Sequence, residues 1–496
     1  KLMTVSRRDV LLTAAFAGLS LSGCTMLRNA VAENLGERVP DKLCRTWGKD
    51  IDPDFHLLSR AGFGGYPGDL ERLKKIGRKA WLEEQLNPEA IDDKACDLRS
   101  RRFESLEIDP GTAYEFKREA LRSDMVRHSL LKAVYSRRQL LEVMVEFWSD
   151  HFNISLEKGD CIYLKPTDDR KVVRAHALGK FSDLLLASAR SPAMLVYLDG
   201  KDNKRRNLME KPNENYAREL LELHTMGVNG GYTQLDVLNV ARALSGFRLH
   251  DRYGRGQAYF DKSCHDDGEK LVLGKRIAPG GGEKDLRAVL DIVLAHPSTA
   301  RYIAYKLTRH FVSDEPPPQL CALVAETFTD TGGDIRAMLR TIFDAEQFYD
   351  PCLRGAKFKR PFRFVVSSLR SLAADTDASK ELCQFLSRMG QAPFQYPTPD
   401  GYPVEREPWL GSLLWRWNFA LTLCLGGIEG ASVKNSMARL EAALADGKAD
   451  PALLFPYFTG RKPLPEELSA FQEFAQEAHR RELFGLILAS PAFQMY

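Results

Sequence analysis

The chain has 496 residues, of which 44% are hydrophobic and 28% charged, with a formal net charge of +3 at pH 7. This length and composition are typical of a globular protein with a large core. The near balance of charge provides no net attraction to a polyanion, so we expect no nucleic acid partner.

The N-terminal residues 1–23 have the order of an export signal. Arg7 and Arg8 form a twin-arginine pair, and residues 10–21 form an uncharged, mostly apolar run. A charged region followed by an apolar region and a small-residue box is typical of secreted proteins. The arginine pair indicates the twin-arginine route, which carries folded proteins.

The signal ends in Leu-Ser-Gly-Cys, and Cys24 closes this box. The box resembles a lipoprotein signal, in which Cys24 is lipidated and becomes the mature N-terminus. We therefore expect the chain to be held to a membrane of the cell envelope or periplasm by lipid on Cys24, with residues 24–53 as a tether. Two alternatives are a cleaved signal without lipid and a transmembrane anchor, although a bilayer span takes about 20 residues.

From residue 54 onward the hydrophobic spacing is mostly helical, with apolar residues three and four positions apart. The pattern predicts a mainly α fold, a multi-helical single large domain over residues 54–496. The predicted helices cover residues 69–86, 113–136, 138–153, 175–188, 192–198, 285–295, 300–312, 318–329, 335–345, 362–374 and 380–389. Within the 138–153 helix, Trp148 lies on the apolar stripe and is predicted to be core.

A small sheet signal interrupts the helices. Residues 256–260 and 270–277 have the composition of strands, and Asp266-Asp267-Gly268 between them is a turn sequence. We therefore expect a β-hairpin inset near residues 256–277.

A proline-rich loop over residues 392–408 is followed by Trp409 and contains Phe394, Tyr396 and Tyr402. Such a loop can line a cleft that binds sugar or peptide. It can equally form a rigid lid that packs on the core.

The densest polar segment follows Pro212. On a regular helix of 3.6 residues per turn, Glu214, Arg218 and Glu222 share one face, while Leu220 and Leu223 lie on the core side. This stripe is either an exposed salt-bridge ladder or a carboxylate site whose pKa values are set by the shared arginine.

Metal chelation by this segment is excluded by spacing, because His224 does not lie on the carboxylate face and has leucines three and four residues before it. Thr233 and Asp236 then predict the start of another helix with a near capping box.

His265 and Asp266 form a second candidate. A histidine beside a carboxylate can act as a general base or help to hold a cation. The alternative is a hairpin turn filled with polar residues.

Several motifs together resemble a bacterial family catalogued as domain of unknown function 1800. The motifs that carry the resemblance are the runs at 213–227, 231–236 and 241–247, with shorter matches at 56–64, 147–152, 194–199, 265–266 and 486–494. Phe247 and Tyr402 depart from the pattern, which commonly has Trp there. The resemblance implies an exported envelope protein and makes an exported sulfatase-like protein a candidate partner. It assigns no residue roles.

Two functions remain open. The first is a non-catalytic lipoprotein that binds or supports the assembly or export of an envelope polymer or a partner protein, which requires an exposed apolar or aromatic patch. The second is an envelope enzyme that acts on glycan or peptide by acid–base chemistry, with Glu214, Arg218 and Glu222 at its site. The enzyme requires Glu214, Glu222 and His265 to converge on one cleft.

Overall fold

The computed structural model describes residues 21–36, 43, 48–207, 209–445, 450–477 and 480–496. The prediction of a mainly helical fold is confirmed, since helices alternate with loops from α2 to α26 and strands form only small antiparallel pairs in this part of the chain. Arg7 and Arg8 lie outside the described residues, as does the side chain of Cys24. Among the helices that are described, none has both the length and the apolar character needed to span a bilayer.

The helices of the first half vary from four to eighteen residues. They are α2 (Leu21–Leu35), α3 (Pro53–Ala61), α4 (Asp69–Ile76), α5 (Arg78–Gln85), α6 (Lys94–Ser100), α7 (Pro110–Ala113), α8 (Arg118–Tyr135), α9 (Gln139–His151), α10 (Cys161–Asp168), α11 (Phe181–Ala189), α12 (Pro192–Tyr197), α13 (Asn215–Glu219) and α14 (Gln234–Ala243). Two π-helices, Asp169–Arg174 and Leu220–Thr225, continue α10 and α13.

The predicted helix over residues 69–86 is divided by Gly77 into α4 and α5. Gly77 has φ of 83°, a left-handed conformation that glycine adopts at little cost. Helix α2 covers part of the segment expected to be a tether, and it packs along α6. The tether role itself stays a prediction.

The second half is also helical. Its helices are α15 (Lys284–Leu294), α16 (Pro297–Phe311), α17 (Pro318–Thr331), α18 (Ile335–Asp344), α19 (Pro361–Ser371), α20 (Lys380–Arg388), α21 (Leu413–Leu425), α22 (Lys434–Ala445), α23 (Pro451–Thr459), α24 (Pro465–Glu477), α25 (Arg480–Ala489) and α26 (Pro491–Gln494).

The strands pair differently from the predicted single hairpin. Strand β2 (Ala258–Phe260) pairs with β1 (Phe247–Leu249), and β3 (Lys270–Val272) pairs with β4 (Lys275–Ile277). The predicted strand over residues 270–277 is itself a hairpin, because Leu273 and Gly274 both have positive φ and form its two-residue turn. A third pair joins β5 (Asp375–Thr376) to β6 (Ala431–Ser432).

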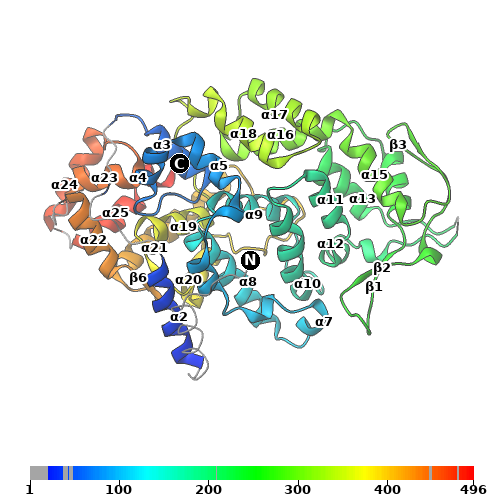
Figure 1. Ribbon diagram of the computed structural model, residues 1–496, viewed down its shortest axis with the longest axis horizontal. Helices are drawn as coiled ribbons and strands as arrows, with labels where there is room; N and C mark the ends of the chain where they lie inside the picture. The colour runs from blue at the N-terminus through cyan, green and yellow to red at the C-terminus, as the bar shows by residue number, and fades with distance from the viewer. Residues whose placement is uncertain (1–20, 37–42, 44–47, 208, 446–449, 478–479) are drawn as a thin grey trace, which may run out of the picture.

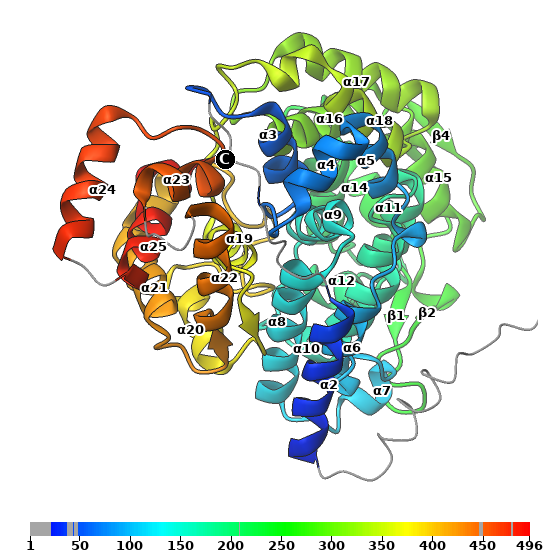
Figure 2. The same cartoon turned by 60° about the vertical axis from the view of Figure 1, so that its left-hand side comes forward.

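Helix α19 lies between the two ends of the molecule. Figures 1 and 2 show α22 to α25 grouped at one end, while α15 and the β-hairpins lie at the other. Helix α19 contacts α8, α20 and α21, and every residue from Pro361 to Ser371 is buried. A helix that is buried on all sides belongs to the centre of a core.

The loop over residues 392–408 is packed on the body of the protein. Tyr402 and Trp409 are buried, and their side chains donate hydrogen bonds to the carbonyl oxygens of Ala392 and Pro403 at 2.5 and 3.2 Å. Gly401 has φ of 76°, and a Cβ atom there would lie 2.3 Å from the carbonyl oxygen of Asp150. The buried aromatic side chains therefore favour the rigid lid over the cleft lining.

Replacing Leu220 tests the core. Leu220 is 0% exposed, so we predict that Leu220→Ala lowers the free energy of unfolding by about 2–5 kcal/mol, as for buried leucines generally. Leu235 on α14 is 60% exposed and provides a matched control, for which the expected loss is under about 0.5 kcal/mol. Urea denaturation measures both, and equal losses would contradict the placement of Leu220.

Candidate functional site

The predicted stripe on the helix after Pro212 is a partly exposed salt-bridge ladder. Arg218 lies 3.4 Å from a carboxylate oxygen of Glu214 and 3.4 Å from one of Glu222, and its side chain is 38% exposed. Gln234, at the start of α14, accepts a hydrogen bond from Arg218 at 2.8 Å and donates one to Glu214 at 2.5 Å. The stripe thus links α13 to α14.

The backbone leaves regular α geometry inside this motif. Residues Leu220–Thr225 form a π-helix, in which the amide of Met226 donates to the carbonyl oxygen of Leu221 at 2.9 Å. The wider turn places Leu221 in the core and leaves Leu223 partly exposed. The prediction that Leu223 is a core residue is therefore wrong, because it assumed regular 100° steps. Single π-turns of this kind are frequent at functional sites.

His224 lies inside the π-helix and is buried. It is 1% exposed, and its ring centroid lies 4.9 Å from that of Phe152. Neither ring nitrogen has a hydrogen-bond partner within the described residues. Burial, followed by the charge of Lys306, lowers the pKa of His224 to about 3, so the ring is neutral near pH 7.

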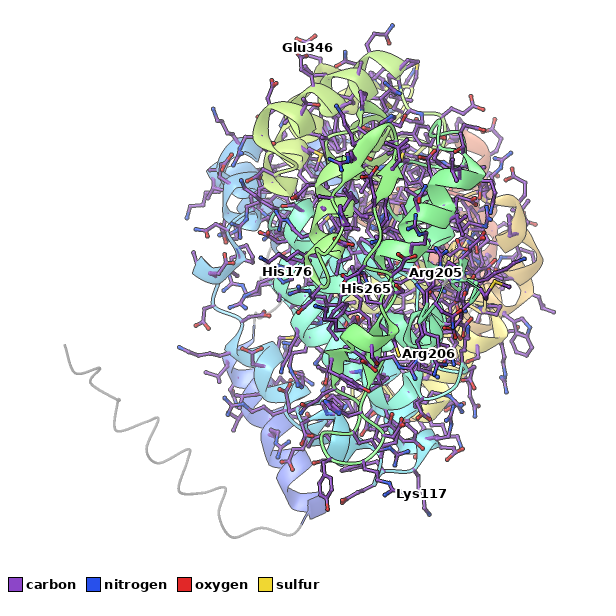
Figure 3. All side chains as sticks on the ribbon, turned by 90° about the vertical axis from the view of Figure 1, so that its right-hand side faces the viewer. Lys117, His176, Arg205, Arg206, His265 and Glu346 are labelled. Atoms are coloured by element: carbon purple, nitrogen blue, oxygen red, sulfur yellow. The ribbon has the colours of Figure 1, made fainter. Side chains whose placement is uncertain are left out.

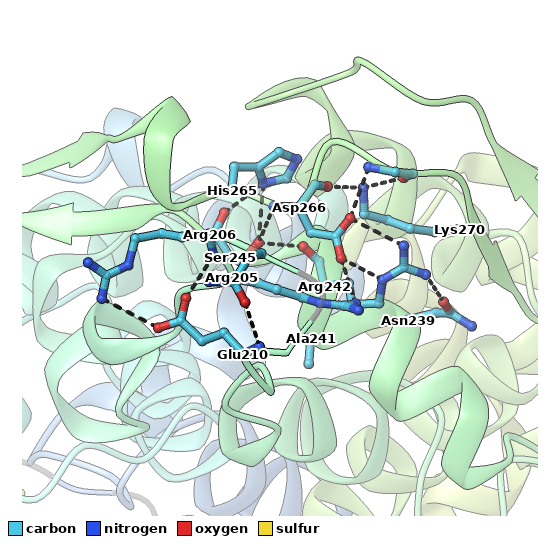
Figure 4. Close-up of polar contacts among 12 residues, drawn as sticks. Arg205, Arg206, Glu210, Asn239, Ala241, Arg242, Ser245, His265, Asp266 and Lys270 are labelled. Atoms are coloured by element: carbon cyan, nitrogen blue, oxygen red, sulfur yellow. Dashed lines mark hydrogen bonds and ion pairs between the residues drawn. The ribbon is translucent and has the colours of Figure 1, made fainter.

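His265 and Asp266 belong to a second, buried polar cluster at the end of the molecule that carries the hairpins. Figure 3 views this end and labels Arg205 and His265 on it, and Figure 4 shows the contacts among the cluster residues. Asp266 receives hydrogen bonds from Arg242 at 2.7 and 3.2 Å and pairs with Arg205 at 2.6 Å. Burial raises the pKa of Asp266. Hydrogen bonds from Arg242 and from the amide of Gly268 lower it, as do the charges of Arg242 and Arg205, and the resulting pKa is about 2.

His265 has an acceptor at each ring nitrogen. Nδ1 lies 2.8 Å from the carbonyl oxygen of Ser245, and Nε2 lies 3.2 Å from a carboxylate oxygen of Asp285. Lys270 pairs with the same oxygen of Asp285 at 2.6 Å. Because both nitrogens face acceptors, neither presents a free lone pair to a substrate. The geometry therefore supports a structural role for His265 rather than that of a general base.

The two predicted groups are at opposite ends of α14. Gln234 contacts the Glu214 ladder, whereas Arg242 contacts Asp266. At about 1.5 Å per residue, these two positions are about 12 Å apart along the helix axis. Within the described residues, no hydrogen bond or ion pair joins Glu214 or Glu222 to His265. The convergence that the enzyme hypothesis requires is not seen.

A third group was not identified in the sequence. The charges of Asp150 and Asp400 act on Lys306 of α16, whose Nζ atom is 5.6 Å from the ring centroid of Tyr302, while Asp150 itself pairs with Arg360 at 2.6 Å. Burial lowers the pKa of Lys306 to about 8, although the two carboxylates oppose this shift. Burial also raises the pKa of Glu219, and the neighbouring Glu222 adds to the increase. We call Lys306, Asp150, Asp400, Tyr302 and Glu219 the Lys306 group.

The Lys306 group combines an amine and a carboxyl whose pKa values both shift toward neutrality. Such shifts are typical of groups that transfer protons. Tyr302 and Lys306 are four residues apart on α16, but the other members come from distant parts of the chain and no spacing in the sequence connects them to this helix. Among the described residues, no set of three or more His, Cys, Asp and Glu side chains is arranged to hold a metal ion.

Comparison with known proteins supports the resemblance found in the sequence. A family model described as "Protein of unknown function (DUF1800)" matches residues 56–495, nearly the whole chain. Neither the curated proteins nor the solved structures contain a match.

Arg218 is more exposed than Arg242, so the two replacements should lower the free energy of unfolding by different amounts. Arg218→Ala should lower the free energy of unfolding by under about 1 kcal/mol, because its ion pairs are partly exposed. Arg242→Ala should cost about 3 kcal/mol, since Asp266 is 8% exposed and loses a buried partner. Urea denaturation measures the free energy of unfolding of both variants. A larger loss for Arg218→Ala than for Arg242→Ala would contradict the placement of Arg218 at the surface.

The pKa of Asp266 predicts a loss of stability in acid. A carboxyl whose folded pKa is lowered to about 2 stabilises the fold above its unfolded pKa of about 4, and this contribution disappears as the pH falls through 2. We predict that the free energy of unfolding decreases less between pH 5 and 2 in Asp266→Asn than in the unmodified protein. Parallel pH profiles of the two proteins would contradict this assignment.

Proposed function

Since the chain belongs to the family described as DUF1800, we propose that it is an exported, lipid-anchored protein of the cell envelope that binds a partner protein. Export and anchoring are supported by the arginine pair and by the box that ends in Cys24. The binding role is supported by one surface feature, an apolar stripe on α21.

The α21 stripe consists of four large exposed apolar side chains, of which Leu414, Trp417 and Leu425 lie on α21 and Leu410 lies in the 3-10 helix Glu407–Ser412 that precedes it. Leu410, Leu414, Trp417 and Leu425 are 44, 62, 49 and 47% exposed. Within α21, separations of three and eight residues place Leu414, Trp417 and Leu425 on one face of the helix. The other face of α21 is buried against α19, α20 and α25.

Exposure of several large apolar side chains on one face is costly in water, although Asn418 is exposed on the same face and the indole of Trp417 donates to the carbonyl oxygen of Ala489 on α25 at 3.2 Å. Single exposed leucines are ordinary, but aligned apolar side chains mark interaction sites. Trp417 adds a side-chain type that is enriched in protein interfaces. A partner that covers the stripe would remove this apolar surface from water.

An enzymatic function is the alternative, and a specific observation keeps it open. With His265 held by two acceptors, acid–base chemistry would depend on the Lys306 group rather than on Glu214, Arg218 and Glu222 alone. Glu222 borders this group through its effect on Glu219. In this alternative, the substrate is an envelope glycan or peptide.

Membrane attachment depends on Cys24. We predict that Cys24→Ala blocks lipidation and releases the protein in soluble form, because the apolar run is too short to span a bilayer. Fractionation after a salt wash measures the change. A variant that remains in the membrane would contradict the lipid anchor, and normal export after Arg7→Lys and Arg8→Lys would exclude the twin-arginine route.

Site-specific photo-crosslinking tests the α21 stripe. A photoreactive residue in place of Leu414 should give one discrete crosslinked protein in intact cells. The same residue in place of Leu323, a leucine on α17 that is 49% exposed, is the control and should not give that product. With the photoreactive residue kept at 414, Leu410→Gln combined with Leu425→Gln should abolish the product. An identical pattern at both positions, or no product at 414, would contradict the proposed surface.

A further inference from the structure

Five cationic side chains are buried where α3, the segment before α19, α19 and α21 meet. They are Arg60, Lys357, Lys359, Arg363 and Arg416, with exposures of 1, 3, 6, 3 and 0%. We call them the cation cluster.

The charges of the cation cluster oppose one another. Burial, followed by the charges of Arg363 and Arg416, keeps the pKa of Lys359 well below its usual range. Burial also lowers the pKa of Arg60 to about 10, although neighbouring Tyr496 opposes this change.

Few carboxylates balance this charge. Lys357 pairs with Asp314 at 2.5 Å, and the described residues contain no other ion pair to the cluster. Several donors also lack partners within the described residues: Nε and Nη1 of Arg60, Nη2 of Arg363 and Nη2 of Arg416. A buried cation is expensive unless an anion and hydrogen bonds compensate it.

A pocket opens beside the cluster, between the loop after α3, α19 and α23. Its volume is about 40 Å³, and Arg363 and Lys359 both line it. A cavity of about 10–15 Å³ on this measure holds one water molecule, so the pocket is large enough for a few waters or one small ion. The hydroxyl-bearing residues in its lining are Ser59, Tyr66, Ser367, Ser371, Tyr457 and Tyr496.

The donors at this pocket are only partly used. Nη1 of Arg363 donates to the carbonyl oxygens of Ser59 and Gly62 at 2.8 and 2.6 Å, which fixes the guanidinium in place while Nη2 has no protein partner in the described residues. Nζ of Lys359 lies 3.4 Å from the ring centroid of Phe493, and no hydrogen bond of Nζ is found in the described residues. A fixed guanidinium beside a lysine amine is an arrangement that can bind phosphate, sulfate or carboxylate oxygens.

We propose that this pocket binds a small oxyanion through Arg363 and Lys359. The ligand chemistry is a tetrahedral oxyanion or a carboxylate group, whose negative oxygens accept hydrogen bonds from the two buried cations. Glu71 also lines the pocket and is more exposed than either cation. Its negative charge favours a small anion over a long polyanion.

Binding calorimetry on the full chain tests the site with inorganic phosphate, sulfate and acetate at constant ionic strength in chloride. The informative variant is Lys359→Met, which keeps an apolar stem against Phe493 and removes the charge. Loss of a hydrogen bond to a charged group should weaken anion binding by about tenfold or more. Lys284→Met is the matched control, because Lys284 is exposed on α15.

The expected result is saturable binding that Lys359→Met weakens and Lys284→Met does not. Binding of phosphate and sulfate without acetate would assign a tetrahedral oxyanion, whereas binding of acetate alone would assign a carboxylate. Ser59→Ala, which removes one hydroxyl from the lining, provides a second and milder variant if Lys359→Met does not fold. No saturable binding of any of the three anions, or equal affinity in the unmodified protein and in the variants of Lys359 and Ser59, would overturn the proposal.

Discussion

Buried guanidinium groups on α19 connect the N-terminal and C-terminal parts of the chain. Arg363 donates to the carbonyl oxygens of Ser59 and Gly62, and Arg370 donates to that of Gly64 at 2.8 Å. The loop after α3 has little regular structure, so its carbonyl groups need partners of this kind when they are buried. The arginines therefore fix the loop and α19 relative to one another.

The same constraint shapes the surfaces that carry the proposals. Because α19 is buried on all sides, the helices around it present their outer faces to solvent, and one of these is the α21 stripe. Nη1 of Arg363 donates to two carbonyl oxygens of the loop, and the same side chain lines the pocket. The structural contact and the proposed oxyanion site thus share one side chain, which ties the integrity of the pocket to that of the core.

The features that follow from local spacing were predicted well from the sequence. Trp148 is 0% exposed as its apolar stripe indicates, and Thr233 forms the capping box with Asp236. Features that depend on non-local pairing were not predicted. Strand β2 pairs with β1, which precedes it in the chain, rather than with the following strand as the sequence predicts. The amide of Met226 bonds to the carbonyl oxygen of Leu221 in a π-turn, and no residue type in the sequence indicates this change. The contacts of α19 join residues about 300 positions apart, beyond any periodic pattern.

The most direct test of this account is the urea unfolding of Arg370→Met. The variant removes the donors to the carbonyl oxygens of Gly64 and Val134 and takes the cationic partner from Asp69, which keeps the hydrogen bond from the amide of Tyr66. We expect a loss of about 3–5 kcal/mol in the free energy of unfolding, against under about 1 kcal/mol for the exposed control Arg388→Met. A cost for Arg370→Met no larger than that of the control would contradict the central role of the α19 arginines.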